Sequence, residues 1–330
     1  MIITVTPDPA LTHTWTVPDL TLGRHNSGAQ GNTRAGGNGV DVSRILCAYG
    51  YESVAVTTAG GPTGSVFSAD LATSGIPNRI VPVNHPTRSC LELVTMDGAA
   101  LTAVDQSRSQ LTASEADSLV ETVLRIPGPE IVALCGPLPA GFHPSHVADL
   151  VSRIKAEGSV ALVNVSGASL IAAARVRADV LTANETEIST ATGIDNPLAA
   201  AQLLVDAGAR AVLVTTASND VIVATATQSV SGPLTLPNRG ADSPGTGATF
   251  IAAACGQLLH DSDPDLEIFR VARQAVLAPD PEPVPMANLP HSNQRVAATM
   301  PATLPSTLRQ SRAVVRRSPA TEQMIVHHAS

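Results

Sequence analysis

Short apolar segments alternate with longer segments of helical periodicity along most of the chain. The apolar segments are rich in β-branched residues and predict strands at residues 2–6, 54–58, 79–83, 90–95, 131–135, 160–165, 179–182, 211–215 and 221–226. The periodic segments predict helices at residues 40–49, 64–74, 114–125, 143–156, 185–192, 197–207, 245–259 and 265–277. Short apolar strands that alternate with helices are typical of a mostly parallel sheet covered on both faces. The pattern therefore predicts an α/β fold.

Two regions depart from this alternation. Residues 14–34 alternate only weakly and contain Gly23, Gly28 and Gly31, which predicts short strands outside the main core. Residues 279–330 contain eight prolines and five arginines with little periodicity. Such a composition predicts an irregular, Pro-rich C-terminal tail after the folded part.

Composition and charge exclude several classes of function. The formal net charge is −8 and aromatic residues make up 2% of the chain, which disfavours binding to nucleic acid. No apolar run is long enough to cross a bilayer, and the first residues lack the pattern of a signal peptide. The four cysteines are widely spaced, without a CxxC pair, so reduced thiols are expected rather than a zinc site. These features predict a cytoplasmic protein that binds neither nucleic acid nor membrane.

Three glycine-rich segments lie where a loop meets a helix, at residues 35–41, 134–141 and 242–248. Glycines at such places let the backbone approach a ligand closely, and the free N–H groups of a helix N-terminus favour an anion. None of the three is followed by the Gly-Lys-Ser/Thr of a Walker A loop. Together they favour a phosphate-bearing ligand.

Eight motifs occur in order along the chain: TPDPALT at 6–12, GGNGVDVSR at 36–44, GGPTG at 60–64, TR at 87–88, GPLPAG at 136–141, VSG at 165–167, NETE at 184–187 and DSPGTGA at 242–248. In order and spacing they resemble the motifs of the PfkB (ribokinase-like) carbohydrate kinases. The similarity is to the branch that contains 1-phosphofructokinase and tagatose-6-phosphate kinase, and it runs from residue 1 to about 277.

The resemblance implies a ribokinase-like three-layer fold with a mostly parallel central sheet and a small β-sheet lid. It implies a kinase domain over residues 1–278, with lid segments near 12–34 and 84–107. It also implies ATP and Mg²⁺ as cofactors, a sugar phosphate or a similar polyol phosphate as substrate, and a homodimer that forms through the lid strands.

Site residues are carried over where the motifs match. The resemblance implies that the acceptor is bound by Thr12, Gly37, Asn38, Asp41, Arg88 and Gly136, with Arg88 on its phosphate. The nucleotide would contact Thr182, Asn184, Thr215, Ala217, Gly245 and Gly247, and Asn184 and Glu187 would hold Mg²⁺. The segment Gly245, Thr246, Gly247 would form the anion hole for the transferred phosphoryl group.

The departures from the family pattern are as informative. The family's catalytic base is the last Asp of GAGD, and that place is Ala248 here. An alternative register over 240–243 places a proline at the helix start and ignores the glycines that follow, so it is disfavoured. Other family residues are also replaced, by Thr12, Asn38, Asp41, Pro137 and Thr182, and both glycines of the nucleotide loop at 215–220 are missing.

Two functions from different classes follow. The first is a divergent kinase in which Asp41 or Asp8 replaces the base. The second is a pseudokinase that keeps the fold as a binding or regulatory protein. Ordinary structural roles remain open for the acids: Asp41 paired with Arg44 one helical turn along, Asp8 as a turn residue, and Asn184 with Glu187 as a helix cap.

Overall fold

The computed structural model describes residues 1–96, 101–218, 220–233 and 246–260. The predicted helix at 265–277 and the predicted tail at 279–330 lie outside the described residues, as does Gly245.

A nine-stranded sheet forms the centre of the molecule, with strand order β13-β12-β11-β10-β9-β8-β1-β4-β5. The strands from β11 to β5 in this order run parallel, whereas β12 and β13 are antiparallel additions at one edge. The strands are β1 (Ile2–Thr6), β4 (Ser53–Ala59), β5 (Asn78–Pro82), β8 (Ile131–Cys135), β9 (Val160–Asn164), β10 (Val180–Asn184), β11 (Ala211–Thr215), β12 (Asp220–Thr225) and β13 (Ser229–Pro233). Strands β1 and β8 are buried along their whole length because helices cover both faces of the sheet.

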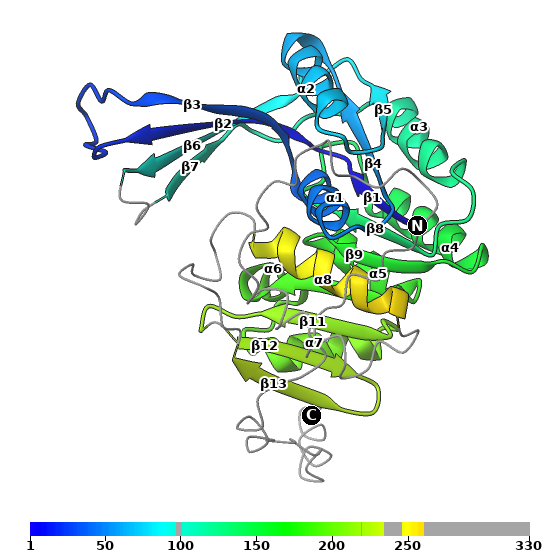
Figure 1. Ribbon diagram of the computed structural model, residues 1–330. Helices are drawn as coiled ribbons and strands as arrows, with labels where there is room; N and C mark the ends of the chain where they lie inside the picture. The colour runs from blue at the N-terminus through cyan, green and yellow to red at the C-terminus, as the bar shows by residue number, and fades with distance from the viewer. Residues whose placement is uncertain (97–100, 219, 234–245, 261–330) are drawn as a thin grey trace, which may run out of the picture.

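The helices form one layer on each face of this sheet (Figure 1). One face is covered by α1 (Asn38–Ala48), α2 (Gly61–Thr73) and α8 (Thr246–His260), whose apolar side chains form two buried clusters with the sheet. The other face is covered by α3 (Ala113–Leu124), α4 (Pro144–Ala156), α5 (Ala168–Arg175), α6 (Glu185–Thr192) and α7 (Pro197–Asp206), around the largest cluster. The predicted three-layer α/β fold is therefore confirmed.

A second, four-stranded sheet projects from the side of the large one (Figure 1). Its order is β3-β2-β6-β7, formed by β2 (Ala10–Val17), β3 (Ala29–Gly36), β6 (Arg88–Thr95) and β7 (Leu101–Asp105). We call it the small sheet. The weak alternation of residues 14–34 had predicted strands outside the main core, and β2 and β3 are such strands.

Strand β1 is the point at which the order of the large sheet reverses. The chain passes from β1 to β4 and β5 on one side, and later to β8 and the following strands on the other. In open parallel sheets, ligands bind at the carboxyl ends of the strands at such a switch point. That position is occupied here by the segment after Thr6 and by Gly136, which follows β8.

The sequence pattern did not predict three elements. Strand β7 lies inside the lid segment expected near 84–107 but was not expected as a separate strand; the other two are α5 and β13. Helix α5 has eight residues, which is too few for its helical periodicity to be recognised. Strand β13 contains serine, glycine and proline, residues that are uncommon in strands. Helix α5 and strand β13 form because the neighbouring α4 and β12 provide a surface on which to pack.

Candidate functional site

The starts of α1 and α8 lie close together at the carboxyl edge of the large sheet. Gly37, the residue before α1, has a φ of 119°, and a Cβ there would lie 2.9 Å from the Thr6 side chain, so the position requires glycine. Asn38 donates to Asn164 Oδ1 at 2.9 Å, and Asn164 in turn donates to the carbonyl of Thr182 at 3.0 Å. A Cβ on Gly247 would lie 4.0 Å from Asn38 Oδ1. The structure thus brings Gly37, Asn38, Gly247 and Thr182, four of the expected site residues, to one edge of the large sheet.

Arg88 joins the two sheets through an ion-pair cluster. Its Nε lies 3.3 Å from Oδ2 of the fully buried Asp8, although neither of these two atoms makes a hydrogen bond of normal geometry. Its Nη1 pairs with Asp105, at the end of β7. Arg108 approaches the same Asp8 oxygen at 3.9 Å, and Ser109 N–H donates to Asp8 Oδ1 at 3.3 Å. Arg88, the predicted phosphate ligand, is therefore already flanked by two carboxylates.

Asp41 is held between two arginines. Its carboxylate pairs with Arg44 on the same helix and with Arg34 from β3. Burial and the nearby Arg34 charge lower the pKa of Arg44, despite the opposing effect of Asp41. The ordinary structural role considered for Asp41, an acid paired with Arg44, is observed, and Arg34 adds a link between α1 and the small sheet.

Asn184 and Glu187 form a complete capping box at the start of α6. Glu187 N–H donates to Asn184 Oδ1 at 2.8 Å, and Asn184 N–H donates to Glu187 Oε2 at 2.9 Å. Burial raises the pKa of Glu187, although the Asn184 hydrogen bond and the charge of Arg108 act in the opposite direction. Both residues thus have the structural role expected of a helix cap, while Glu187 Oε1 accepts no hydrogen bond from any described residue.

The loop predicted to bind the nucleotide follows β11. Thr215 is the last residue of that strand and pairs in register with Asn184. Ala217 N–H donates to Glu185 Oε2 at 2.9 Å, and Thr216 and Asp220 bond each other across the loop. The amide of Ala217 is therefore engaged by a carboxylate, and the loop is closed by its own hydrogen bonds.

The remaining predicted residues differ in their surroundings. Thr246 begins α8, and Gly247 is exposed in its first turn. Ala248 is 2% exposed and packs in the apolar cluster between α8, α1 and the sheet. Thr12 is buried in β2, where a Cβ on Gly36 would meet its hydroxyl at 2.4 Å. Gly136 donates to the Asn164 carbonyl at 2.6 Å and precedes a cis peptide bond to Pro137.

Four polar residues of this site were not predicted: Arg34, Asp105, Arg108 and Asn164. Asn164 ends a predicted strand, and a polar residue at that place is a usable signal. The other three lie on the small sheet or just after it, and no motif or periodicity indicated which of these side chains turn toward the large sheet.

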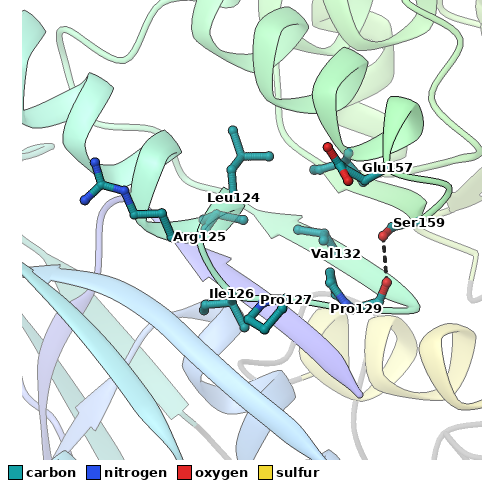
Figure 2. A pocket seen from close by; sticks show the side chains of 11 residues that line it. Leu124, Arg125, Ile126, Pro127, Pro129, Val132, Glu157 and Ser159 are labelled. Atoms are coloured by element: carbon teal, nitrogen blue, oxygen red, sulfur yellow. Dashed lines mark hydrogen bonds between the residues drawn. The ribbon is translucent and has the colours of Figure 1, made fainter.

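A cavity of about 380 Å³ opens at the opposite edge, where β8 and β9 begin (Figure 2). Apolar side chains, Arg125 and Glu157 line it, and Ser159 is bonded to the carbonyl of Pro129 at 2.6 Å.

Within the described ranges, no group of three or more His, Cys, Asp or Glu side chains forms a metal site. The same ranges contain no helix with the length and apolar character needed to cross a membrane.

Comparisons with known proteins agree with this geometry. Residues 15–276 match the pfkB family carbohydrate kinases. The chain is 26% identical over 282 residues to a 1-phosphofructokinase of Rhodobacter capsulatus, covering 83% of this chain and 87% of the relative. It is 24% identical over 192 residues to a tagatose-6-phosphate kinase of Staphylococcus epidermidis, covering 57% of this chain and 61% of the relative. The solved phosphofructokinase-2 of Escherichia coli has a TM-score of 0.74 at 23% identity, over 83% of this chain and 92% of that one. The predicted ribokinase-like architecture is thereby confirmed.

Proposed function

Because the chain belongs to the pfkB family of carbohydrate kinases, as its motifs predicted, we propose that it transfers the γ-phosphate of ATP to an alcohol oxygen of a sugar phosphate or a similar polyol phosphate. The observation that carries the proposal is the gathering of basic residues and helix starts at the switch point of the sheet. Arg88 and Arg108 lie beside Asp8, and the charge of Arg108 acts on Glu187. Phosphoryl transfer asks a protein mainly for positioning and for stabilisation of negative charge.

The acceptor would lie between the small sheet and the starts of α1 and α8. Arg88 would hold its resident phosphate, and Thr12, Gly37, Asn38, Asp41 and Gly136 would line its polyol part. The backbone N–H groups of Gly245, Thr246 and Gly247 would face the transferred phosphoryl group at the start of α8. The exposed position of Gly247, close to Asn38, supports this placement.

Mg²⁺ and ATP fit the site unequally. Within the part of the chain that the structure describes, Glu187 keeps one carboxylate oxygen without a donor, which suits a cation that takes few protein ligands and keeps its waters. Asn184 and Glu187 would therefore hold Mg²⁺ through water, and the ion would offset phosphate charge. The loop after β11 fits a nucleotide less well, because the amide of Ala217 is taken by Glu185. We expect ATP bound near Thr182, Thr215 and Ala217 to bind weakly.

The missing base limits the rate of this reaction. The alcohol oxygen forms a bond to the γ-phosphorus, the bond from that phosphorus to the bridging oxygen breaks, ADP departs, and the alcohol proton must go to a base or to water. Ala248 cannot accept it, and the carboxylates of Asp41 and Asp8 are each engaged by two arginines. Loss of a general base costs about 10²–10⁴ in rate, or about 3–5 kcal/mol of barrier.

A second candidate function is a pseudokinase that binds a phosphorylated ligand without turnover. The burial of Ala248 in the apolar cluster favours it, because that side chain points into the core. The engagement of both alternative acids favours it as well. The two functions share the ligand site and differ in whether phosphate is transferred.

The deciding experiment measures ADP formation by the native chain with MgATP and a panel of sugar phosphates, next to calorimetric binding of MgATP. Slow turnover that depends on one acceptor supports the kinase. MgATP binding without turnover supports the pseudokinase, and absence of both contradicts the proposal. The variant Ala248→Asp, checked for folding by thermal unfolding, should raise the rate by about 10²–10⁴ if a carboxylate at this place reaches the acceptor. A folded variant without any gain supports the pseudokinase, in agreement with the burial of Ala248.

We further propose that the chain forms a homodimer through the small sheet. Trp15 and Val104 are 49% and 57% exposed, and strand pairing through Leu91 and Leu93 places them on the same face. An apolar sheet face of this kind favours burial against a second copy. Sedimentation should give a dimer that Trp15→Glu dissociates. A monomer at micromolar concentrations in the native chain would refute the dimer.

A further inference from the structure

Arg108 has a fixed backbone position above the carboxyl edge. It lies in the loop between β7 and α3, and its neighbour Ser109 is bonded on both sides. Ser109 N–H donates to Asp8 Oδ1 at 3.3 Å, while the Ser109 carbonyl accepts the N–H of Ala140 at 2.8 Å. Leu111 N–H then donates to the Ala140 carbonyl at 2.8 Å. These bonds attach the loop to the segments after β1 and after β8, at the switch point.

The guanidinium of Arg108 is held much less firmly than its backbone. Its side chain is 55% exposed, its nearest carboxylate oxygen is 3.9 Å away, and it makes no hydrogen bond to any described residue. By contrast, Arg88 is 7% exposed and pairs closely with Asp105, and Arg34 and Arg44 are hydrogen-bonded to Asp41. Among these four arginines, Arg108 alone keeps all its donors available.

Arg108 also lies between the two halves of the candidate site. On one side it approaches Asp8, the partner of Arg88. On the other side its charge acts on the carboxylate of Glu187, where it partly opposes the burial that raises the pKa of that group. Burial and, after it, the charge of Arg88 lower the pKa of Arg108 itself, so the two arginines lie within electrostatic reach of each other.

The charges around this point explain why a free cation is needed. Asp8, Asp105 and Glu187 would repel an incoming phosphate group, and Arg88 is already paired with two of them. A planar guanidinium can donate two parallel hydrogen bonds to phosphate oxygens, which a lysine ammonium does not reproduce. Arg108 can do so by giving up only a contact of 3.9 Å.

We propose that Arg108 is a phosphate-binding residue of this site, whose guanidinium binds a phosphate group that enters between Arg88 and Glu187. This inference rests on the proposed function for the identity of the ligand class. The phosphate comes either from the acceptor or from the transferred end of ATP, and the two sources are separable by binding measurements.

The test compares calorimetric binding to the native chain, Arg108→Gln, Arg108→Lys and the control Arg125→Gln. Arg125 is an exposed arginine beside the cavity at the opposite edge, so its variant has the same change in charge away from the site. The probes, titrated separately, are fructose 1-phosphate, fructose 6-phosphate and MgATP. We expect Arg108→Gln to weaken binding about 10- to 100-fold, the effect of a charge-assisted hydrogen bond. Arg108→Lys should bind more tightly than Arg108→Gln but more weakly than the native chain. Arg125→Gln should bind as tightly as the native chain.

The pattern of losses identifies the source of the phosphate. A loss confined to the fructose phosphates assigns Arg108 to the acceptor's phosphate, and a loss confined to MgATP assigns it to the transferred group. Equal affinities of Arg108→Gln and the native chain, or no binding of any probe to the native chain, would overturn the inference. Turnover is measured separately, so a chain that binds through Arg108 without turnover refutes the kinase and leaves this inference standing.

Discussion

Two helices in this molecule begin with the same local device and differ in what surrounds it. The α3 cap consists of Thr112 and Glu115, and the α6 cap consists of Asn184 and Glu187. Each is a complete capping box, in which the first side chain accepts from the N–H three residues on and the glutamate accepts from the first N–H. Judged from local sequence alone, the two are interchangeable.

The pKa values of their glutamates are nevertheless shifted in opposite directions. Glu115 accepts from the backbone and hydroxyl of Thr112 and from the backbone and amide of Asn84, and these hydrogen bonds lower its pKa. Among the described residues, Glu187 accepts only from Asn184 N–H, and burial raises its pKa. The oxygens of Glu115 are saturated with donors, whereas Glu187 has one oxygen left for a ligand.

The comparison teaches that a capping box is no evidence for a metal site. What distinguishes the α6 cap is its place at the carboxyl end of β10 and its proximity to Arg108. The α3 cap starts after the loop that follows β7, and its glutamate is occupied by Asn84, which lies just beyond the edge strand β5. The Mg²⁺ role proposed for Glu187 therefore rests on the position of α6 in the fold and not on its capping box.

The largest expected difference between the two caps is in Mg²⁺ binding. Glu187→Gln keeps an oxygen for the Asn184 N–H and removes the carboxylate charge, so it separates the role in the helix cap from the proposed role in Mg²⁺ binding. We expect the Mg²⁺ concentration needed for half-maximal ATP binding to rise about 10- to 100-fold, as for other outer ligands of metal sites. Calorimetric titration of ATP at a series of Mg²⁺ concentrations measures this shift.

Glu115→Gln is the matched control for that measurement. It makes the same substitution at the same position of a capping box, and we expect no change in the Mg²⁺ dependence. An equal shift in both variants, or none in Glu187→Gln, would mean that α6 carries a cap and nothing more.

A smaller effect is expected on stability, and there the two caps should behave alike. Thr112→Ala and Asn184→Ala each remove the side-chain acceptor at a helix start, which costs about 0.5–2 kcal/mol of unfolding free energy. Urea denaturation of both variants, with unchanged slopes, gives the two values. If Asn184→Ala left the unfolding free energy unchanged while Thr112→Ala lowered it, the α6 cap would not stabilise the fold, in contradiction to its hydrogen-bond geometry.

The contrast between local sequence and distant surroundings also explains how much of this fold is predicted from the sequence. The large sheet and most of its helices are predicted because their apolar periodicity is strong, as in β1, β8 and α4. The segments 36–44 and 184–187 are recognised as helix starts from their residues alone. The order of the strands, and with it the meeting of Asp8 and Arg88, is not contained in any local pattern.

The site itself is predicted only in part, for a physical reason. Motifs identify residues by type, whereas their availability depends on partners that are distant in sequence. Arg88 is engaged by Asp8 and Asp105, and Asp41 by Arg34, and none of these pairs is visible as a motif. Arg108 belongs to no motif at all, and its position is known only because the loop is bonded to Asp8 and Ala140.

The smallest expected effect is on the pH dependence of stability, and its sign should differ between the caps. The lowered pKa of Glu115 means that its contribution is present above the ordinary glutamate value and is lost as the pH falls through its folded-state pKa. The raised pKa of Glu187 has the opposite sign: its contribution is complete below the ordinary value and is lost as the pH rises through the folded-state pKa. Relative to the native chain, Glu115→Gln should therefore lose stability and Glu187→Gln should gain it as the pH is raised from about 4 to about 8. Urea midpoints of the three proteins across this range measure both trends, each smaller than the loss of a whole cap. Parallel trends would show that the two glutamates share one environment, and the distinction between the caps would then fail.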